Sequence, residues 1–306
     1  MIFMKIAICQ YNPIIGDLKG NAKKILDGYK KAINDGADLV VFPELFICGY
    51  PPLDLVEKKE FRDAVRNATE EIASLTTNTG LIFGTITEDY EELVGTGVYN
   101  SAVLCYDGKI QFVQSKSLIP NYDVFDEVRY FEPAKEVRIH EFKNEKLGIS
   151  ICEDIWNDAD YWKKRRYPVD PVQKQVELGA TLLINISASP YAYGKRKLRH
   201  QMLSVLTKTD SLPLVYACCV GAQTELIFDG ASMCFNSEGK LCMLGKAFQE
   251  DYFIFDTQEN YDEINNVESN FEKEALNALI LGLKDYANKT GFKKALVGLS
   301  GGIDSA

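Results

Sequence analysis

The strongest indication of the fold and of the chemistry is residues 148–156, which read Gly148-Ile-Ser-Ile-Cys152-Glu153-Asp154-Ile-Trp156. Residues 147–151 are apolar or small and predict a buried strand, so Cys152 stands where that strand ends. Open α/β folds place reactive groups at the carboxyl ends of their strands. The two acids after the cysteine disfavour its thiolate, which is the nucleophilic form. We therefore expect a base and a positive charge to come from elsewhere in the chain.

Length and composition indicate a globular protein of one large or two medium domains. The chain has 306 residues, of which 46% are hydrophobic. Its 34 basic and 44 acidic residues give a net charge of −10, which argues against nucleic acid or an anionic membrane as a partner. The apolar start is interrupted by Lys5 and is too short for a signal peptide, and no apolar run is long enough to span a membrane. These features favour a cytoplasmic protein.

The cysteines and histidines narrow the possible chemistry. The eight cysteines lie in apolar, strand-like contexts without C-x-x-C spacing, which favours reduced core thiols over disulfides or a zinc site. His140 and His200 are the two histidines of the chain. So few histidines argue against a Ser-His-Asp triad or a His-ligated metal, and we expect no metal site.

Strands and helices alternate along the first 256 residues in two similar halves, which predicts two sheets faced by helices. The expected helices are 21–35, 57–78, 167–178 and 196–209. The expected strands are 5–10, 37–42, 81–86, 99–106, 109–115, 137–142, 147–151, 180–187, 213–220, 231–236, 240–245 and 253–256. The pairs 99–106 with 109–115, 137–142 with 147–151, and 231–236 with 240–245 are expected to be hairpins.

The last fifty residues differ in character. Residues 258–270 are rich in Asp, Glu and Asn and predict an exposed linker. A helix over 272–289 and a strand over 294–299 are expected to follow, and the strand leads into Ser300-Gly-Gly-Ile-Asp-Ser305. The basic runs at 163–166 and 195–199 are interpreted as solvated helix faces, apart from Lys195.

Three chemically useful residues each follow a predicted strand: Glu44, Lys116 and Cys152. If those strands share a sheet system, the side chains can converge on one pocket. Glu44 would then be the general base, Cys152 the nucleophile and Lys116 the positive charge. Taken singly, such a glutamate is more often a cap or surface acid, and a buried cysteine is usually core packing.

These residues resemble the motifs of the nitrilase, or carbon-nitrogen hydrolase, superfamily. The resemblance covers residues 4–256 and rests on Phe42-Pro-Glu44-Leu with Gly49-Tyr50, on Lys116 with Leu118-Ile-Pro120, and on the stretch around Cys152. More narrowly, residues 118–131 and 185–190 resemble the glutaminase domains of glutamine-dependent NAD synthetases. Residues 300–305 are similar to the PP-loop of ATP pyrophosphatases, where small residues let backbone N–H groups approach a pyrophosphate.

This resemblance implies an α/β fold: a four-layer αββα nitrilase-type sandwich over residues 1–257, a linker over 258–271, and the first helix and strand of a PP-loop domain over 272–306. It implies that glutamine is hydrolysed through a thioester at Cys152, without a cofactor. The ammonia would serve the ATP-dependent amidation of nicotinic acid adenine dinucleotide to NAD, with ATP and Mg as cofactors of the full-length synthetase. The superfamily also implies a homo-oligomer.

The resemblance assigns roles to further residues. Glu127 matches a second glutamate that orients Lys116 or the leaving group, with an ordinary loop acid as the alternative. Tyr122, Ser189 and Lys195 match residues that bind the α-amine and α-carboxylate of glutamine, and Glu153 is a candidate partner for the amine. The ATP-binding positions of the PP-loop would be Gly298, Ser300, Gly301, Gly302, Asp304 and Ser305. Because the sequence stops directly after this loop, we expect the residues from about 290 onward to be poorly ordered and to bind ATP negligibly.

Two other functions fit parts of the pattern. A stand-alone amidase acting on a carbamoyl or ω-amide substrate would share the triad but not the 300–305 motif. A non-catalytic ammonia-channel or oligomerisation module would carry a vestigial triad, and its Cys152 would not be trapped by an electrophile.

Overall fold

Two six-stranded sheets form the centre of the computed structural model, which describes residues 4–89, 91, 94–267 and 270–305. The first sheet has the order β14-β1-β2-β3-β4-β5 and the second β13-β12-β9-β8-β7-β6. Strands of the first sheet are β1 (Lys5–Gln10), β2 (Leu39–Val41), β3 (Gly80–Glu88), β4 (Val98–Tyr106), β5 (Lys109–Ser115) and β14 (Asp251–Asp256). Strands of the second are β6 (His140–Phe142), β7 (Glu145–Ile151), β8 (Leu182–Ser187), β9 (Leu214–Cys218), β12 (Met233–Phe235) and β13 (Leu241–Leu244).

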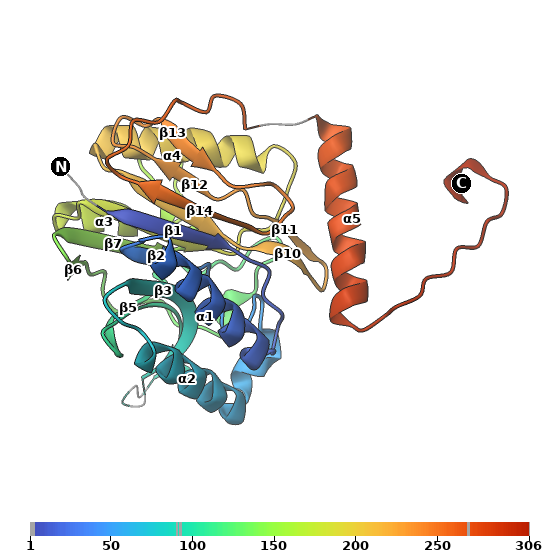
Figure 1. The fold of residues 1–306 in the computed structure, drawn as a ribbon, viewed down its shortest axis with the longest axis horizontal. Helices are drawn as coiled ribbons and strands as arrows, with labels where there is room; N and C mark the ends of the chain where they lie inside the picture. The colour runs from blue at the N-terminus through green and yellow to red at the C-terminus, as the bar shows by residue number, and fades with distance from the viewer. Residues whose placement is uncertain (1–3, 90, 92–93, 268–269, 306) are drawn as a thin grey trace.

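Alternating side chains bury both faces of each sheet. In β1, Ala7 and Cys9 belong to the core under the helices α1 (Leu18–Asn34) and α2 (Lys59–Ser74), whereas Ile6 and Ile8 belong to the core between the sheets. The helices α3 (Pro171–Glu177) and α4 (Lys195–Asp210) cover the outer face of the second sheet. Figure 1 shows these layers, and they confirm the predicted four-layer αββα sandwich.

The directions of the strands bring the functional segments to one edge. β1, β2 and β3 are parallel, and β5 runs the same way as β3 because each is antiparallel to β4. In the second sheet β7, β8 and β9 are parallel. The residues that follow β2 and β5 therefore lie at one edge of the first sheet, and those that follow β7 and β8 at one edge of the second.

Several predicted elements differ from the structure in extent. The expected strand 137–142 begins at His140, and the expected helix 167–178 begins at Pro171, with Asp170 as its N-cap. The expected strand 213–220 is divided, since Cys219 separates β9 from β10 (Val220–Gln223). β10 pairs with β11 (Leu226–Asp229), which was not predicted, in a separate two-stranded hairpin. The three predicted sheet hairpins are present.

The helix α5 (Phe271–Lys289) matches the predicted helix and packs against the β10–β11 hairpin (Figure 1). Its Asp285 accepts hydrogen bonds from Ala222 N and Asn12 Nδ2. The expected exposure of residues 258–270 is only partly right, because Val267 is buried and Ile264 packs on the core under α4. Residues 1–3, 268–269 and 306 of the predicted domain division lie outside the described residues.

The predicted strand over 294–299 is wrong. These residues, all of them described, form an extended exposed segment, and Leu296 is 100% exposed. An apolar pattern makes a strand only where neighbouring strands accept its backbone hydrogen bonds and cover its side chains.

Candidate active site

Glu44 follows β2 and is fully buried. Pro43, directly before it, prevents the strand from continuing. The chain at residues 44–45 passes very close to Gly84 of β3. A Cβ on Gly84 would lie 2.0 Å from Leu45 N and 2.7 Å from Glu44 Cα. Glycine is therefore required at position 84, because any side chain there would displace the carboxylate-bearing turn.

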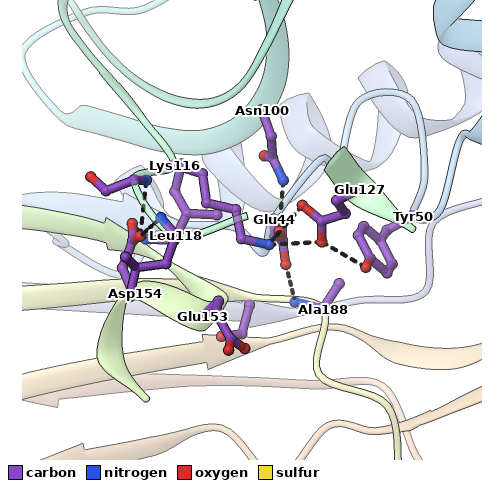
Figure 2. A network of polar contacts seen from close by, with 12 residues as sticks. Glu44, Tyr50, Asn100, Lys116, Leu118, Glu127, Glu153, Asp154 and Ala188 are labelled. Atoms are coloured by element: carbon purple, nitrogen blue, oxygen red, sulfur yellow. Dashed lines mark hydrogen bonds and ion pairs between the residues drawn. The ribbon is translucent and has the colours of Figure 1, made fainter. Parts of the chain in front are cut away.

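Lys116, which follows β5, is fully buried between two carboxylates (Figure 2). Its Nζ lies 2.8 Å from Glu44 Oε1 and 2.8 and 2.9 Å from the two oxygens of Glu127. Burial opposes the charged amine, but Glu127 and Glu44 together raise the pKa of Lys116 well above its usual value. The residue is therefore a buried cation.

The two glutamates are held by further donors. Asn100 Nδ2 donates to Glu44 Oε1 across 2.7 Å, and Ala188 N donates to Glu44 Oε2 across 2.8 Å. Ala188 follows β8 of the second sheet, so Glu44 links the two sheets. Tyr50 donates its hydroxyl hydrogen to Glu127 across 2.8 Å. These bonds fix both carboxylates, and Figure 2 shows the resulting network.

Cys152 lies at the turn between β7 and a short 3-10 helix over residues 152–155. Its φ of 42° is left-handed, a strained conformation for a residue with a Cβ. Burial, and then the Glu44 charge, raise the pKa of the Cys152 thiol well above its usual value, whereas Lys116 lowers it. The thiol is therefore protonated at rest and needs a base when it reacts.

A cavity of about 1030 Å³ opens over Cys152. It brings together Cys152 and all four residues that the sequence assigned to substrate: Tyr122, Glu153, Ser189 and Lys195. Trp156, Trp162 and Leu198 supply apolar surface to its wall. A cavity with a few polar groups set among aromatic side chains is typical of a small-molecule site.

Glu153 is an acidic residue of this cavity and is adjacent in sequence to Cys152. The Tyr122 hydroxyl donates to its two oxygens at 2.8 and 2.9 Å, and the Tyr167 hydroxyl donates to Oε1 at 3.0 Å. Lys195 Nζ donates to the Pro190 carbonyl, and burial lowers the pKa of Lys195. The cavity therefore holds a fixed carboxylate and an amine within the same wall.

Comparison with known proteins places this site in a family. The carbon-nitrogen hydrolase family model matches residues 5–264, which include every residue of the network and the cavity. The chain belongs to the carbon-nitrogen hydrolase family. A second model, NAD synthase, matches residues 275–306.

Similar proteins share this carbon-nitrogen hydrolase fold and extend beyond it. The chain is 40% identical over 309 residues to a glutamine-dependent NAD(+) synthetase of Synechocystis sp., covering 98% of this chain and 55% of that protein. It is 36% identical to the synthetase of Thermotoga maritima, covering 99% of this chain and 57% of that protein. The solved synthetase of Acinetobacter baumannii, in complex with ADP, superimposes with a TM-score of 0.88 at 32% identity, covering 99% and 56% of the two chains. This carbon-nitrogen hydrolase chain thus spans about half the length of the relatives that it matches.

The predictions for the two basic runs are only partly right, because residues 163–166 are exposed as expected. Residues 163–166 form no helix, and Lys164, Arg165 and Arg166 line the cavity, with the Arg166 guanidinium 3.6 Å from the Tyr122 ring centroid. Arg196 and Arg199 of α4 are buried rather than solvated, and both bind Asp229. Tertiary contacts, which a local charge run does not reveal, decide these positions.

Other residues of the network were missed. One is Asn100, which binds Glu44, and another is Tyr167, which binds Glu153. The third is Asp154, which binds the main chain beside Lys116. Asp154 had one local signal, because it stands three residues beyond the end of a strand, and its side chain accepts from Ile151 N. Asn100 and Tyr167 carry no such signal.

The six PP-loop positions lie apart from this site. Residues 300–305 form a turn in which Ser305 N donates to the Gly302 carbonyl, at the far end of the segment beyond α5 (Figure 1). In the described part of the chain, no group of three or more His, Cys, Asp or Glu side chains is arranged to hold a metal ion. Among the same residues, no helix has the length and apolar character that crossing a membrane requires.

Proposed function

We propose that the carbon-nitrogen hydrolase domain hydrolyses glutamine to glutamate and ammonia, with Cys152 as the nucleophile. The observation that carries this proposal is the buried Glu44–Lys116–Glu127 network, whose charges act on a thiol that lines a cavity. A neutral thiol, a carboxylate and a fixed cation are the three groups that amide hydrolysis through a thioester requires.

The reaction begins when Glu44 takes the proton of Cys152 and Sγ bonds to the side-chain amide carbon. Lys116 Nζ and the Glu153 backbone N–H stabilise the oxyanion of the tetrahedral intermediate. The C–N bond breaks, Glu44 returns the proton to the leaving nitrogen, and ammonia and a thioester result. Glu44 then takes a proton from water, which attacks the thioester, and the proton returns to Cys152 as glutamate leaves. Glu127 holds Lys116 in place and does not exchange protons.

Selectivity for glutamine comes from the cavity walls. Glu153 binds the α-ammonium group of glutamine. The hydroxyls of Tyr122 and Tyr167 hold the Glu153 carboxylate in place. Lys195 and Ser189 bind the α-carboxylate. The matched family pattern assigned Tyr122 to glutamine directly, and its hydrogen bonds to Glu153 favour an indirect role instead.

We also propose that residues 272–306 begin a second domain that uses this ammonia to amidate nicotinic acid adenine dinucleotide. The match of residues 275–306 to the NAD synthase model and the names of the relatives support this. Gly301 has a φ of 83°, which glycine tolerates, and residues 300–302 are exposed, which fits a phosphate-binding turn. ATP with Mg²⁺ would supply the activation of the carboxylate, with residues Gly298, Ser300, Gly301, Gly302, Asp304 and Ser305 holding the nucleotide.

Two further features belong to this proposal. A cytoplasmic location agrees with eight buried free thiols, since reducing compartments keep cysteines unpaired. A homo-oligomer is proposed from the superfamily resemblance.

A turnover assay tests the proposed substrate. Ammonia release from glutamine should exceed release from asparagine and from simple aliphatic amides, because only glutamine reaches Cys152 with both α-groups bound. Equal or faster turnover of an amide without α-groups would instead indicate a stand-alone amidase. A folded protein without turnover of any amide would indicate a non-catalytic module.

A further inference from the structure

We propose that Asp154 is a positioning residue that aligns Lys116 with Cys152 across the two sheets. This inference deepens the proposed function and rests on it for the identity of the reacting groups. Asp154 is 1% exposed and lies in the turn that follows Cys152. It touches main chain rather than substrate, so its effect on the reaction is exerted through its neighbours.

The Asp154 carboxylate joins two segments that come from different sheets. Oδ1 accepts from Ser117 N across 2.9 Å and from Leu118 N across 2.8 Å, directly after Lys116 and β5. Oδ2 accepts from Ile151 N across 3.0 Å, directly before Cys152 at the end of β7. Figure 2 shows Asp154 beside the Lys116 and Leu118 main chain. One side chain therefore sets the spacing between the cation and the nucleophile.

The chemistry of the group suits this task. A carboxyl group can accept several hydrogen bonds at once, and three backbone donors offset part of the cost of burying it. The bond to Ile151 N also supports the left-handed turn at Cys152, which is strained and needs surrounding contacts to persist. Glu44 makes a second link between the sheets through Ala188 N, so the catalytic set is tied at two points.

A merely structural cap would affect stability without a specific effect on the chemical step. A positioning residue lowers kcat more than it changes KM, because misplacement by about 1 Å costs roughly 100-fold in rate while the glutamine contacts persist. Its loss also slows the reaction of Cys152 with small reagents that do not occupy the glutamine cavity.

The test uses Asp154→Asn, which keeps the size of the side chain but sets an NH₂ group against backbone donors. Asp158→Asn is the matched control, since Asp158 is also a buried acid in this segment and accepts from the nearby backbone at Tyr161 N. We expect Asp154→Asn to lower kcat for glutamine about 100-fold with KM within about threefold, and Asp158→Asn to retain wild-type kcat. Wild-type kcat in folded Asp154→Asn, or an equal loss in Asp158→Asn, would overturn the proposal.

A second readout separates this proposal from the proposed function. The alkylation rate of Cys152 by iodoacetamide, followed by mass spectrometry, needs no glutamine and should fall about tenfold in Asp154→Asn. If wild type does not hydrolyse glutamine, the proposed function is wrong, and an unchanged alkylation rate in the variant would refute the positioning role separately. If Asp154→Asn does not fold, Asp154→Glu keeps the carboxyl group but displaces both oxygens. The same losses are expected there, and wild-type rates would contradict the proposal.

Discussion

Lys116 donates to Glu44 across 2.8 Å in a part of the molecule where neither side chain reaches solvent. The two residues are 72 positions apart in the chain and follow β5 and β2 of the same sheet. A buried ion pair of this kind is weak support for stability but holds its groups in a defined geometry. Here it keeps a cation and a carboxylate beside the thiol of Cys152, whose pKa both groups affect.

Replacing Lys116 with Met should destabilise the fold and abolish turnover. The substitution leaves Glu44 and Glu127 buried without their cation, and breaking a buried pair costs about 3–5 kcal/mol. Urea denaturation measures the free energy of unfolding, and ammonia release measures activity. Lys240→Met is the control, since Lys240 pairs with Glu238 at the surface and should leave both quantities nearly unchanged. A Lys116→Met protein as stable as wild type would contradict the account of the network.

Glu44→Gln should lower kcat for glutamine by about 10²–10⁴-fold, which is the usual contribution of a general base. The amide retains an oxygen that can accept from Lys116 or Asn100, so the loss of stability should be smaller than for Lys116→Met. Steady-state kinetics and thermal melting separate the two effects. A variant that keeps wild-type kcat would show that Glu44 is not the base.

Glu153→Gln should raise KM for glutamine about 10- to 100-fold, because a charge-assisted hydrogen bond contributes about 1.5–3 kcal/mol. The KM for glutaric acid monoamide, which lacks the α-amine, should change much less. Tyr167→Phe should raise the KM for glutamine less than Glu153→Gln does, because Tyr122 still holds the Glu153 carboxylate. Equal changes in KM for both substrates would show that Glu153 does not recognise the ammonium group.

The free energy of unfolding should depend on pH through Asp154. Burial raises the pKa of Asp154 from its usual value to about 7, although three backbone donors lower it. A raised pKa means that the folded state binds the proton more tightly than the unfolded state, so the contribution of Asp154 to stability is fully present at low pH. It decreases as the pH rises from about 4 to about 7.

The unfolding free energy of wild type minus that of Asp154→Asn isolates this contribution, since the other titrating groups are shared. This difference in unfolding free energy should fall as the pH rises from about 4 to about 7 and should level off above about pH 7. A difference that stays constant, or that rises with pH, would contradict the raised pKa.

Local patterns in the sequence predict much of this fold. The strand that ends at Cys152, the hairpin at Asp107–Gly108 and the helix α5 follow from periodicity and turn residues near each element. The predictions fail where contacts with distant parts of the chain determine the structure. Residues 294–299 have a strand pattern but no strand to pair with, and β11 is too short to stand out.

The same division holds for the site. Glu44, Lys116 and Cys152 could be singled out because each follows a strand, and the parallel strands within each sheet bring such positions to a common edge. Asn100 could not, because its bond to Glu44 joins residues 56 positions apart and nothing nearby in sequence marks it. The buried state of Arg196 and Arg199 depends likewise on Asp229, which lies on β11.

We expect Cys152 to form a covalent intermediate with a glutamine-shaped substrate. Labelling with diazo-oxo-norleucine, a glutamine-mimicking electrophile, tests this expectation when the adduct is detected by mass spectrometry on wild type and on Cys152→Ala. We predict a single adduct on the wild-type peptide that contains Cys152, protection by glutamine, and no adduct on the alanine variant. An unlabelled wild type, or labelling that survives in Cys152→Ala, would contradict the claim.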